Sequence, residues 1–167
     1  MSRTARTNAQ GFTLVELMVT LAVAAILTVI GIPAYQDLVR RNRLVTTANA
    51  VATDLVTAKS EAIRRGRAVN VSALSGNGDW TSGWRIWVDQ NANGTFDAGT
   101  DLELEAHPAL AHLEMNATTN VSTVAFNGMA EASTGVVWEL CGESGEEGRR
   151  LNLNVTGRLS VTTVTCP

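Results

Sequence analysis

The segment GFTLVELMVTLAVAAILTVIGIPAY, residues 11–35, decides the fold of the N-terminal part of this chain. From residue 12 to residue 32 its only formal charge is Glu16. These 21 residues would form a helix of roughly 31 Å, which matches the hydrocarbon core of a bilayer. Arg3 and Arg6 precede the segment and no acid does. The positive-inside rule therefore predicts a single-pass protein with its N-terminus in the cytoplasm and its C-terminal domain across the inner membrane, in the periplasm.

A cleaved secretory signal peptide would share the basic start and the apolar stretch. Glu16 argues against that interpretation, because an ionised side chain inside a bilayer costs at least about 2.5–3.5 kcal/mol and normally serves a function with a partner. The helical pattern also continues beyond Pro33. Apolar residues recur there at spacings of three, four or seven, at Leu38, Val45, Ala48, Ala52, Leu55, Ala58 and Ala62. We therefore expect one long helix, with a transmembrane part over 12–33 and an amphipathic part over 34–66.

Beyond residue 66 the apolar residues alternate with polar ones, which is typical of half-buried antiparallel strands. The alternating segments are AVNVSAL, GWRIWVD, DLELE, STVAFN, GVVWEL, RLNLNV and RLSVTTVT. The residues expected to share buried faces are Trp84, Ile86 and Val88, then Val136, Trp138 and Leu140, and then Leu151, Leu153 and Val155. The predicted fold class is α+β, with the long helix packed on an antiparallel β-sheet domain over 67–167.

A glycine, a phenylalanine and a glutamate four residues further on, followed by an apolar run, open this helix. This motif resembles the class III leader and N-terminal helix of type IV pilins and type II secretion pseudopilins. The resemblance implies that prepilin peptidase removes a leader, residues 1–11, by cutting between Gly11 and Phe12. Phe12 would then become an N-methylated N-terminus, and the apolar helix would remain in the product.

The resemblance also gives Glu16 a role in assembly, for a physical reason. Cleavage creates a positive amine on Phe12 in an apolar setting, and the Glu16 carboxylate of an incoming subunit can neutralise the amine of its neighbour. Neither charge is tolerable alone at low dielectric, whereas the pair sets the axial register of the subunits. Pro33 resembles the proline that kinks the helix in this family, because it removes one backbone donor.

Two further segments, GWRIWVDQNANGTFDAGTD at 83–101 and GRRLNLNVTGRLSV at 148–161, extend the resemblance to the GspH/FimT family of minor pilins and pseudopilins. That resemblance implies a place at the filament tip, where the subunit would help to prime assembly. Its partners would be other major and minor pilins or pseudopilins. The sequence contains no pairing of a nucleophile with a base and no metal-ligand set that would indicate an enzyme or a cofactor.

Some members of this family bind DNA for uptake through a C-terminal Gly-Arg-x-Arg motif. The corresponding residues here are 157–160, GRLS, so Ser160 stands where the second arginine would be. Arg149 and Arg150 could supply the missing charge if one hairpin brought them beside Arg158. A DNA-binding minor pilin is therefore the alternative function.

The charge of the C-terminal part disfavours DNA binding. Residues 68–167 contain four basic and twelve acidic residues, a formal charge of about −8, whereas phosphate binding requires positive potential. The three arginines are expected instead to form ion pairs with Glu143, Glu146 and Glu147.

Cys141 and Cys166 both lie outside the membrane in this topology, where an oxidising compartment favours a disulfide over two free core thiols. Closing a loop of this size is worth about 3–4 kcal/mol in the chain-entropy model. His107 and His112 are expected to be surface or loop residues.

One loop resembles the first part of an EF-hand calcium loop, through Asp89, Asn91, Asn93, Gly94 and Asp97. The twelfth position is Thr100 instead of a bidentate glutamate. A hairpin turned by Asx and glycine residues is therefore favoured over a calcium site.

Three arginines, Arg40, Arg41 and Arg43, follow the apolar segment. Their side chains could reach lipid headgroups, pair with acids on neighbouring helices, or line a solvated helix face. The sequence leaves these three interpretations open.

Overall fold

The computed structural model describes residues 12–167, and the chain divides between Val39 and Arg40 into two compact units. The expected leader, 1–11, with the cleavage residue Gly11, lies outside the described residues. One helix, α1 (Leu14–Arg65), contributes to both units and is continuous through Pro33. The single long helix predicted from the sequence is therefore confirmed, whereas a kink at Pro33 stays a prediction.

The N-terminal unit contains the first part of α1. Thr13 caps the helix, because its Oγ1 accepts the backbone N–H of Glu16 at 3.2 Å. The large apolar side chains from Phe12 to Leu38 are between 50% and 79% exposed. By length and composition, α1 can cross a membrane.

In the C-terminal unit, α1 buries a stripe of small and medium apolar residues at alternating spacings of four and three. The stripe consists of Leu44, Ala48, Val51, Leu55, Ala58 and Ala62, each at most 6% exposed. The sequence pattern had included Val45 and Leu38, but these side chains are 39% and 58% exposed. Val45 lies one residue, or about 100°, away from Leu44 on the helix, which places it beside the buried stripe.

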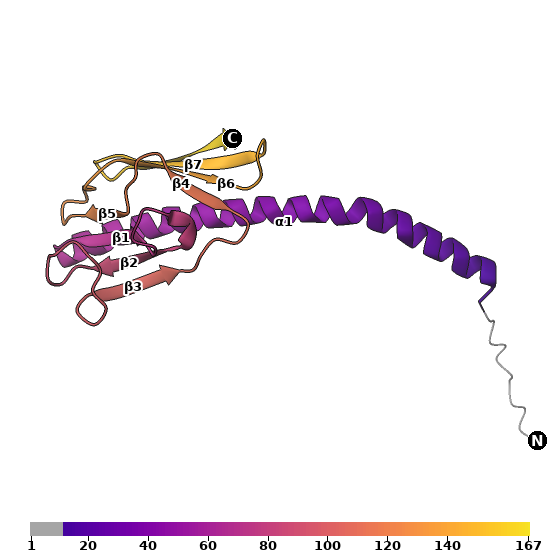
Figure 1. Ribbon diagram of the computed structural model, residues 1–167, viewed down its shortest axis with the longest axis horizontal. Helices are drawn as coiled ribbons and strands as arrows, with labels where there is room; N and C mark the ends of the chain where they lie inside the picture. The colour runs from indigo at the N-terminus through magenta and orange to yellow at the C-terminus, as the bar shows by residue number, and fades with distance from the viewer. Residues whose placement is uncertain (1–11) are drawn as a thin grey trace, which may run out of the picture. The chain divides into compact units, whose positions relative to one another are not determined.

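Two antiparallel four-stranded sheets complete the C-terminal unit, and Figure 1 shows both beside the second half of α1. The first sheet has the order β3-β2-β1-β5. Its strands are β1 (Val69–Ala73), β2 (Trp84–Val88), β3 (Leu102–His107) and β5 (Thr123–Phe126). The second has the order β4-β6-β7-β8. Its strands are β4 (Glu114–Ala117), β6 (Val136–Cys141), β7 (Glu147–Leu153) and β8 (Leu159–Thr165).

These elements confirm the predicted fold class, and seven of the eight strands correspond to the alternating segments. The sequence missed β4 and the short 3₁₀ helix η1 (Trp80–Ser82). The four residues of β4 carry one large apolar side chain, Met115, and are too few to show alternation. Pairing with β6, from Glu114 opposite Cys141 to Ala117 opposite Trp138, makes this segment a strand.

The core confirms two of the three predicted faces. The predicted buried residues of β2 and of β6 are each at most 2% exposed: Trp84, Ile86 and Val88 on β2, and Val136, Trp138 and Leu140 on β6. The third prediction is wrong at Val155, which is 56% exposed although Leu151 and Leu153 are buried. β7 ends at Leu153, and the Oδ1 of Asn154 accepts the N–H groups of Thr156 and Arg158 at 3.1 and 3.0 Å. This Asx turn reverses the chain before Val155 reaches the core.

Candidate functional site

The two residues expected to act in processing and assembly are Phe12, which lies just before α1, and Glu16, which lies in its first turn. Phe12 is 79% exposed, and Glu16 lies exposed in the first helical turn. Thr13 and Glu16 have the spacing of a capping box, and an acid in the first turn also interacts favourably with the helix dipole. Glu16 thus lies exposed at the start of a helix whose apolar surface is uncovered.

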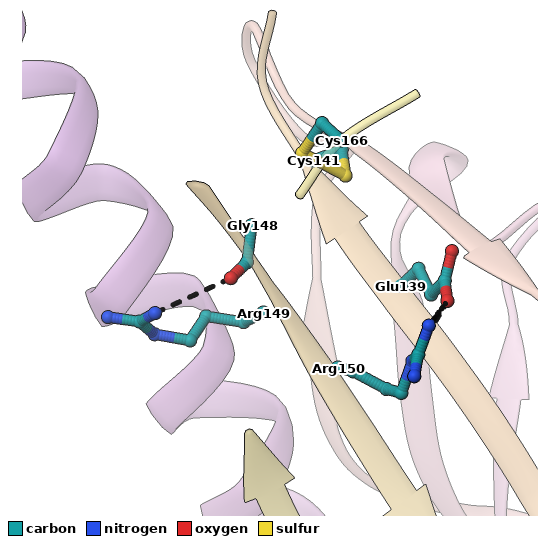
Figure 2. Close-up of a disulfide and its surroundings, with 6 residues drawn as sticks. All are labelled: Glu139, Cys141, Gly148, Arg149, Arg150 and Cys166. Carbon is teal, nitrogen blue, oxygen red and sulfur yellow. Dashed lines mark hydrogen bonds and ion pairs between the residues drawn. A yellow bond between two sulfur atoms is a disulfide. The ribbon is translucent and has the colours of Figure 1, made fainter. Parts of the chain in front are cut away.

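The expected disulfide is confirmed, and it joins Cys141 at the end of β6 to Cys166 just after β8 (Figure 2). The two Cα atoms are 5.7 Å apart. Gly148 of β7 lies against the bridge, and a Cβ there would be 2.7 Å from the Sγ of Cys166 and 2.8 Å from the carbonyl oxygen of Leu140. Only glycine fits this position without a shift of its neighbours.

The loop between β6 and β7 is also tied to α1. Arg40 Nη1 lies 2.8 Å from an oxygen of Glu143 and 3.4 Å from one of Glu146. Both glutamates were expected to pair with the C-terminal arginines. That expectation is wrong, because they pair with Arg40 instead. The pairs are largely exposed, so each contributes about 0–1 kcal/mol.

The three C-terminal arginines do not converge. Arg149 and Arg150 are consecutive on β7, so their side chains leave opposite faces of the sheet (Figure 2). Arg149 pairs with Glu147, as expected, whereas Arg150 pairs with Glu139 at 2.6 Å.

Strand register separates Arg158 from the other two. Arg149 lies opposite Thr163, and the ladder ends at Leu153 opposite Leu159. Arg158 therefore lies beyond the far end of the ladder, at least about 13 Å along the strand from Arg149. The idea that one hairpin brings these charges side by side is wrong.

The loop between β2 and β3 satisfies its own carboxylates. Asp89 is buried, and its Oδ2 accepts the Gly94 N–H at 2.8 Å while its Oδ1 accepts the Asn93 N–H at 3.3 Å. The side-chain amides of Asn91 and Asn93 both donate to the Oδ2 of Asp97. These bonds hold the loop together through its own N–H groups, and β2 pairs with β3 in the hairpin that the sequence favoured.

A cluster around Asp54 was missed by the sequence reasoning. Asp54 of α1 is 4% exposed, and the indole N–H of Trp84 donates to its Oδ2 at 2.7 Å. The Nε2 of His107 lies 2.9 Å from the same oxygen and 3.4 Å from the Oε1 of Glu105. The His107 ring stacks on Trp84 with centroids 4.7 Å apart. His107 is thus a partly exposed residue at the end of β3, and not a loop residue.

Burial raises the pKa of the Asp54 carboxyl, while the hydrogen bond from Trp84 and the nearby His107 oppose the rise. The sequence did contain one signal for this cluster. Asp54 follows Val51 by three residues and precedes Ala58 by four, so it lies on the buried stripe of α1. A carboxylate on such a stripe requires polar partners.

Comparison with known proteins gives two family matches. Residues 47–157 match the model described as type II transport protein GspH, and residues 6–32 match the prokaryotic N-terminal methylation motif. The pilin-like protein PilA1 of Thermus thermophilus is 33% identical over 94 residues, which cover 55% of this chain and 56% of PilA1. A fimbrial protein of Pseudomonas aeruginosa is 34% identical over 100 residues, which cover 53% of this chain and 64% of that protein.

The fold is similar to that of the type IV minor pilin FimU of Pseudomonas aeruginosa strain PAO1. One crystal form of FimU superposes with a TM-score of 0.64 at 24% identity, over 78% of this chain and 99% of FimU. A second form gives a TM-score of 0.60 at 25% identity, over 74% of this chain and all of FimU. Both superpositions support the fold class described above, a long helix with antiparallel sheets.

Proposed function

The chain belongs to the type II transport protein GspH family, and from this premise we propose that it is a minor pilin or pseudopilin that enters a filament and helps to prime its assembly. The filament is a type IV pilus or a type II secretion pseudopilus. The observation that carries the proposal is the apolar surface of α1, exposed from Phe12 to Leu38 and interrupted between residues 12 and 32 by one formal charge, Glu16. Such a surface requires lipid before assembly or other helices after it.

The proposed sequence of events begins at the membrane. Prepilin peptidase cuts between Gly11 and Phe12, and Phe12 is N-methylated. The apolar segment 12–33 holds the subunit in the inner membrane, with residues 67–167 in the periplasm. Support comes from the match of residues 6–32 to the N-terminal methylation motif.

Glu16 then recognises a neighbouring subunit. Its carboxylate lies in the first exposed turn of α1, and its partner is the terminal amine of Phe12 on the adjacent helix. An unpaired charge in an apolar filament core is costly, so correct pairing selects one axial register over its neighbours. The C-terminal unit has a hydrophobic core of its own, which contains neither Phe12 nor Glu16.

Substitution of Glu16 tests this proposal. Glu16→Ala and Glu16→Gln should give stable, processed protein in the membrane fraction that is absent from sheared filaments. Thr20→Ala is the matched control, because Thr20 lies one turn further along and its Oγ1 only donates to the carbonyl of Leu17. Normal incorporation of Glu16→Ala would refute the assembly role.

The priming role needs a separate measurement. Sheared major pilin should collapse in a strain that lacks this gene and return when the wild-type gene is restored. An unchanged yield would exclude an essential priming role in the pilus and favour the secretion pseudopilus or DNA uptake.

The alternative, DNA binding for uptake, has less support. Ser160 replaces the second arginine of the motif, and the arginines Arg149, Arg150 and Arg158 are separated as described above. The acidic charge of residues 68–167 also opposes phosphate binding.

A further inference from the structure

We propose that Asp54, Glu105 and His107 form a binding site for a divalent cation of the zinc class. The site joins α1 to β3, and it is independent of the assembly residues at the start of α1. It also differs from the calcium-like loop, which contributes none of the three side chains.

The donor atoms already have nearly the spacing that a metal ion requires. One donor atom from each residue lies within 4.8 Å of the other two. The His107 Nε2 is 2.9 Å from Asp54 and 3.4 Å from Glu105. Tetrahedral ligands at about 2.0–2.2 Å from zinc lie roughly 3.3–3.6 Å from one another, so small side-chain shifts would admit the ion.

The Nε2 of His107 lacks a hydrogen bond, which also points to a ligand. This atom is buried, and in the part of the chain that the structure describes it makes no hydrogen bond of acceptable geometry, although Asp54 is near. A buried nitrogen without a hydrogen bond is unfavourable. Coordination through the Nε2 lone pair would satisfy it.

Trp84 holds two of the three ligands in position. Its indole N–H donates to Asp54, and its ring stacks on the imidazole of His107 with an interplanar angle of 17°. Contacts of this kind orient metal ligands and strengthen binding. Arg85, the neighbour of Trp84 on β2, leaves the opposite face of the strand and pairs with Glu103 at 3.2 Å. The cluster itself consists of two carboxylates and one imidazole.

The ligand set selects the class of cation. One imidazole and two carboxylates suit zinc, whereas calcium takes six to eight oxygen ligands and magnesium demands octahedral oxygen geometry. The Glu105 side chain is 52% exposed. Water can therefore supply the fourth ligand.

The test is a zinc titration of the full chain in detergent micelles, after chelator treatment and removal of the chelator. Isothermal titration calorimetry should give one zinc ion per chain, and bound Co²⁺ should show the visible absorption of a tetrahedral site. Zinc should also raise the Tm, because it binds the folded state. His107→Gln and Glu105→Gln should each weaken binding at least about tenfold.

Glu103→Gln is the matched control, because Glu103 is on the same strand but belongs to the Arg85 pair. It should bind zinc as the wild type does. Glu105→Gln is the decisive variant, since it preserves the contacts of Asp54 with Trp84 and His107, and its Tm without zinc should change little because the pair that it removes is largely exposed. Absence of zinc binding by the wild type, or binding by Glu105→Gln and His107→Gln as tight as that of the wild type, would overturn the proposal whatever the outcome of the filament experiments.

Discussion

The indole N–H of Trp84 donates to the Oδ2 of Asp54 at 2.7 Å, and this bond connects β2 to α1 inside the C-terminal unit. Both residues are at most 4% exposed. A second buried tryptophan on the same strand, Trp87, donates to the Oγ of Ser72 at 3.0 Å. The two indoles differ in their acceptors, one an acid and the other a hydroxyl, and in their aromatic neighbours, because Trp84 stacks on His107 whereas Trp87 meets Phe96 edge to face.

Replacing Trp84 with phenylalanine should lower the free energy of unfolding more than the same change at Trp87. Both changes leave a buried acceptor without its donor, which costs about 1–3 kcal/mol for a neutral group such as the Ser72 hydroxyl and more for a carboxylate such as Asp54. Thermal unfolding of both variants in the same detergent measures the difference. Equal losses would mean that the Asp54 bond has no special weight.

Gly148→Ala should destabilise the protein, because the new Cβ would lie 2.7 Å from the Sγ of Cys166 and 2.8 Å from the carbonyl oxygen of Leu140. Overpacking of this kind costs about 1–3 kcal/mol. Gly142→Ala is the control, since its Cβ would meet no atom closer than 3.6 Å. The measurement is the Tm of each variant with the disulfide intact. A Gly148→Ala protein as stable as Gly142→Ala would show that the strands around the bridge can shift freely.

Features with a local pattern were predictable from the sequence, and features created by distant contacts were not. The length of α1 and the buried faces of Trp84 and Val136 follow from periodicity alone. β4 exists because β6 pairs with it, and its residues show too little alternation by themselves.

The sites follow the same rule. The disulfide could be predicted because pairing is the usual fate of two cysteines in an oxidising compartment, where the predicted topology puts this part of the chain. The register that separates Arg158 from Arg149 depends on where the Asx turn at Asn154 ends β7. The cluster of Asp54 and His107 joins residues 53 positions apart, and no local signal on β3 indicates which helix residue His107 will contact.

Glu61→Gln should lower stability at neutral pH and have little effect in acid. Hydrogen bonds from Arg64 and Arg65 lower the pKa of the Glu61 carboxyl in the folded protein. A lowered pKa contributes stability that is fully present above the unfolded value, about 4.3, and is lost as the pH falls through the folded value. The Tm difference between wild type and Glu61→Gln should therefore be present at about pH 7 and shrink below about pH 4. Glu114→Gln, an exposed change on β4, controls for the general effect of removing one acid. If the two variants lost the same Tm at every pH, the arginine contacts of Glu61 would contribute nothing to stability.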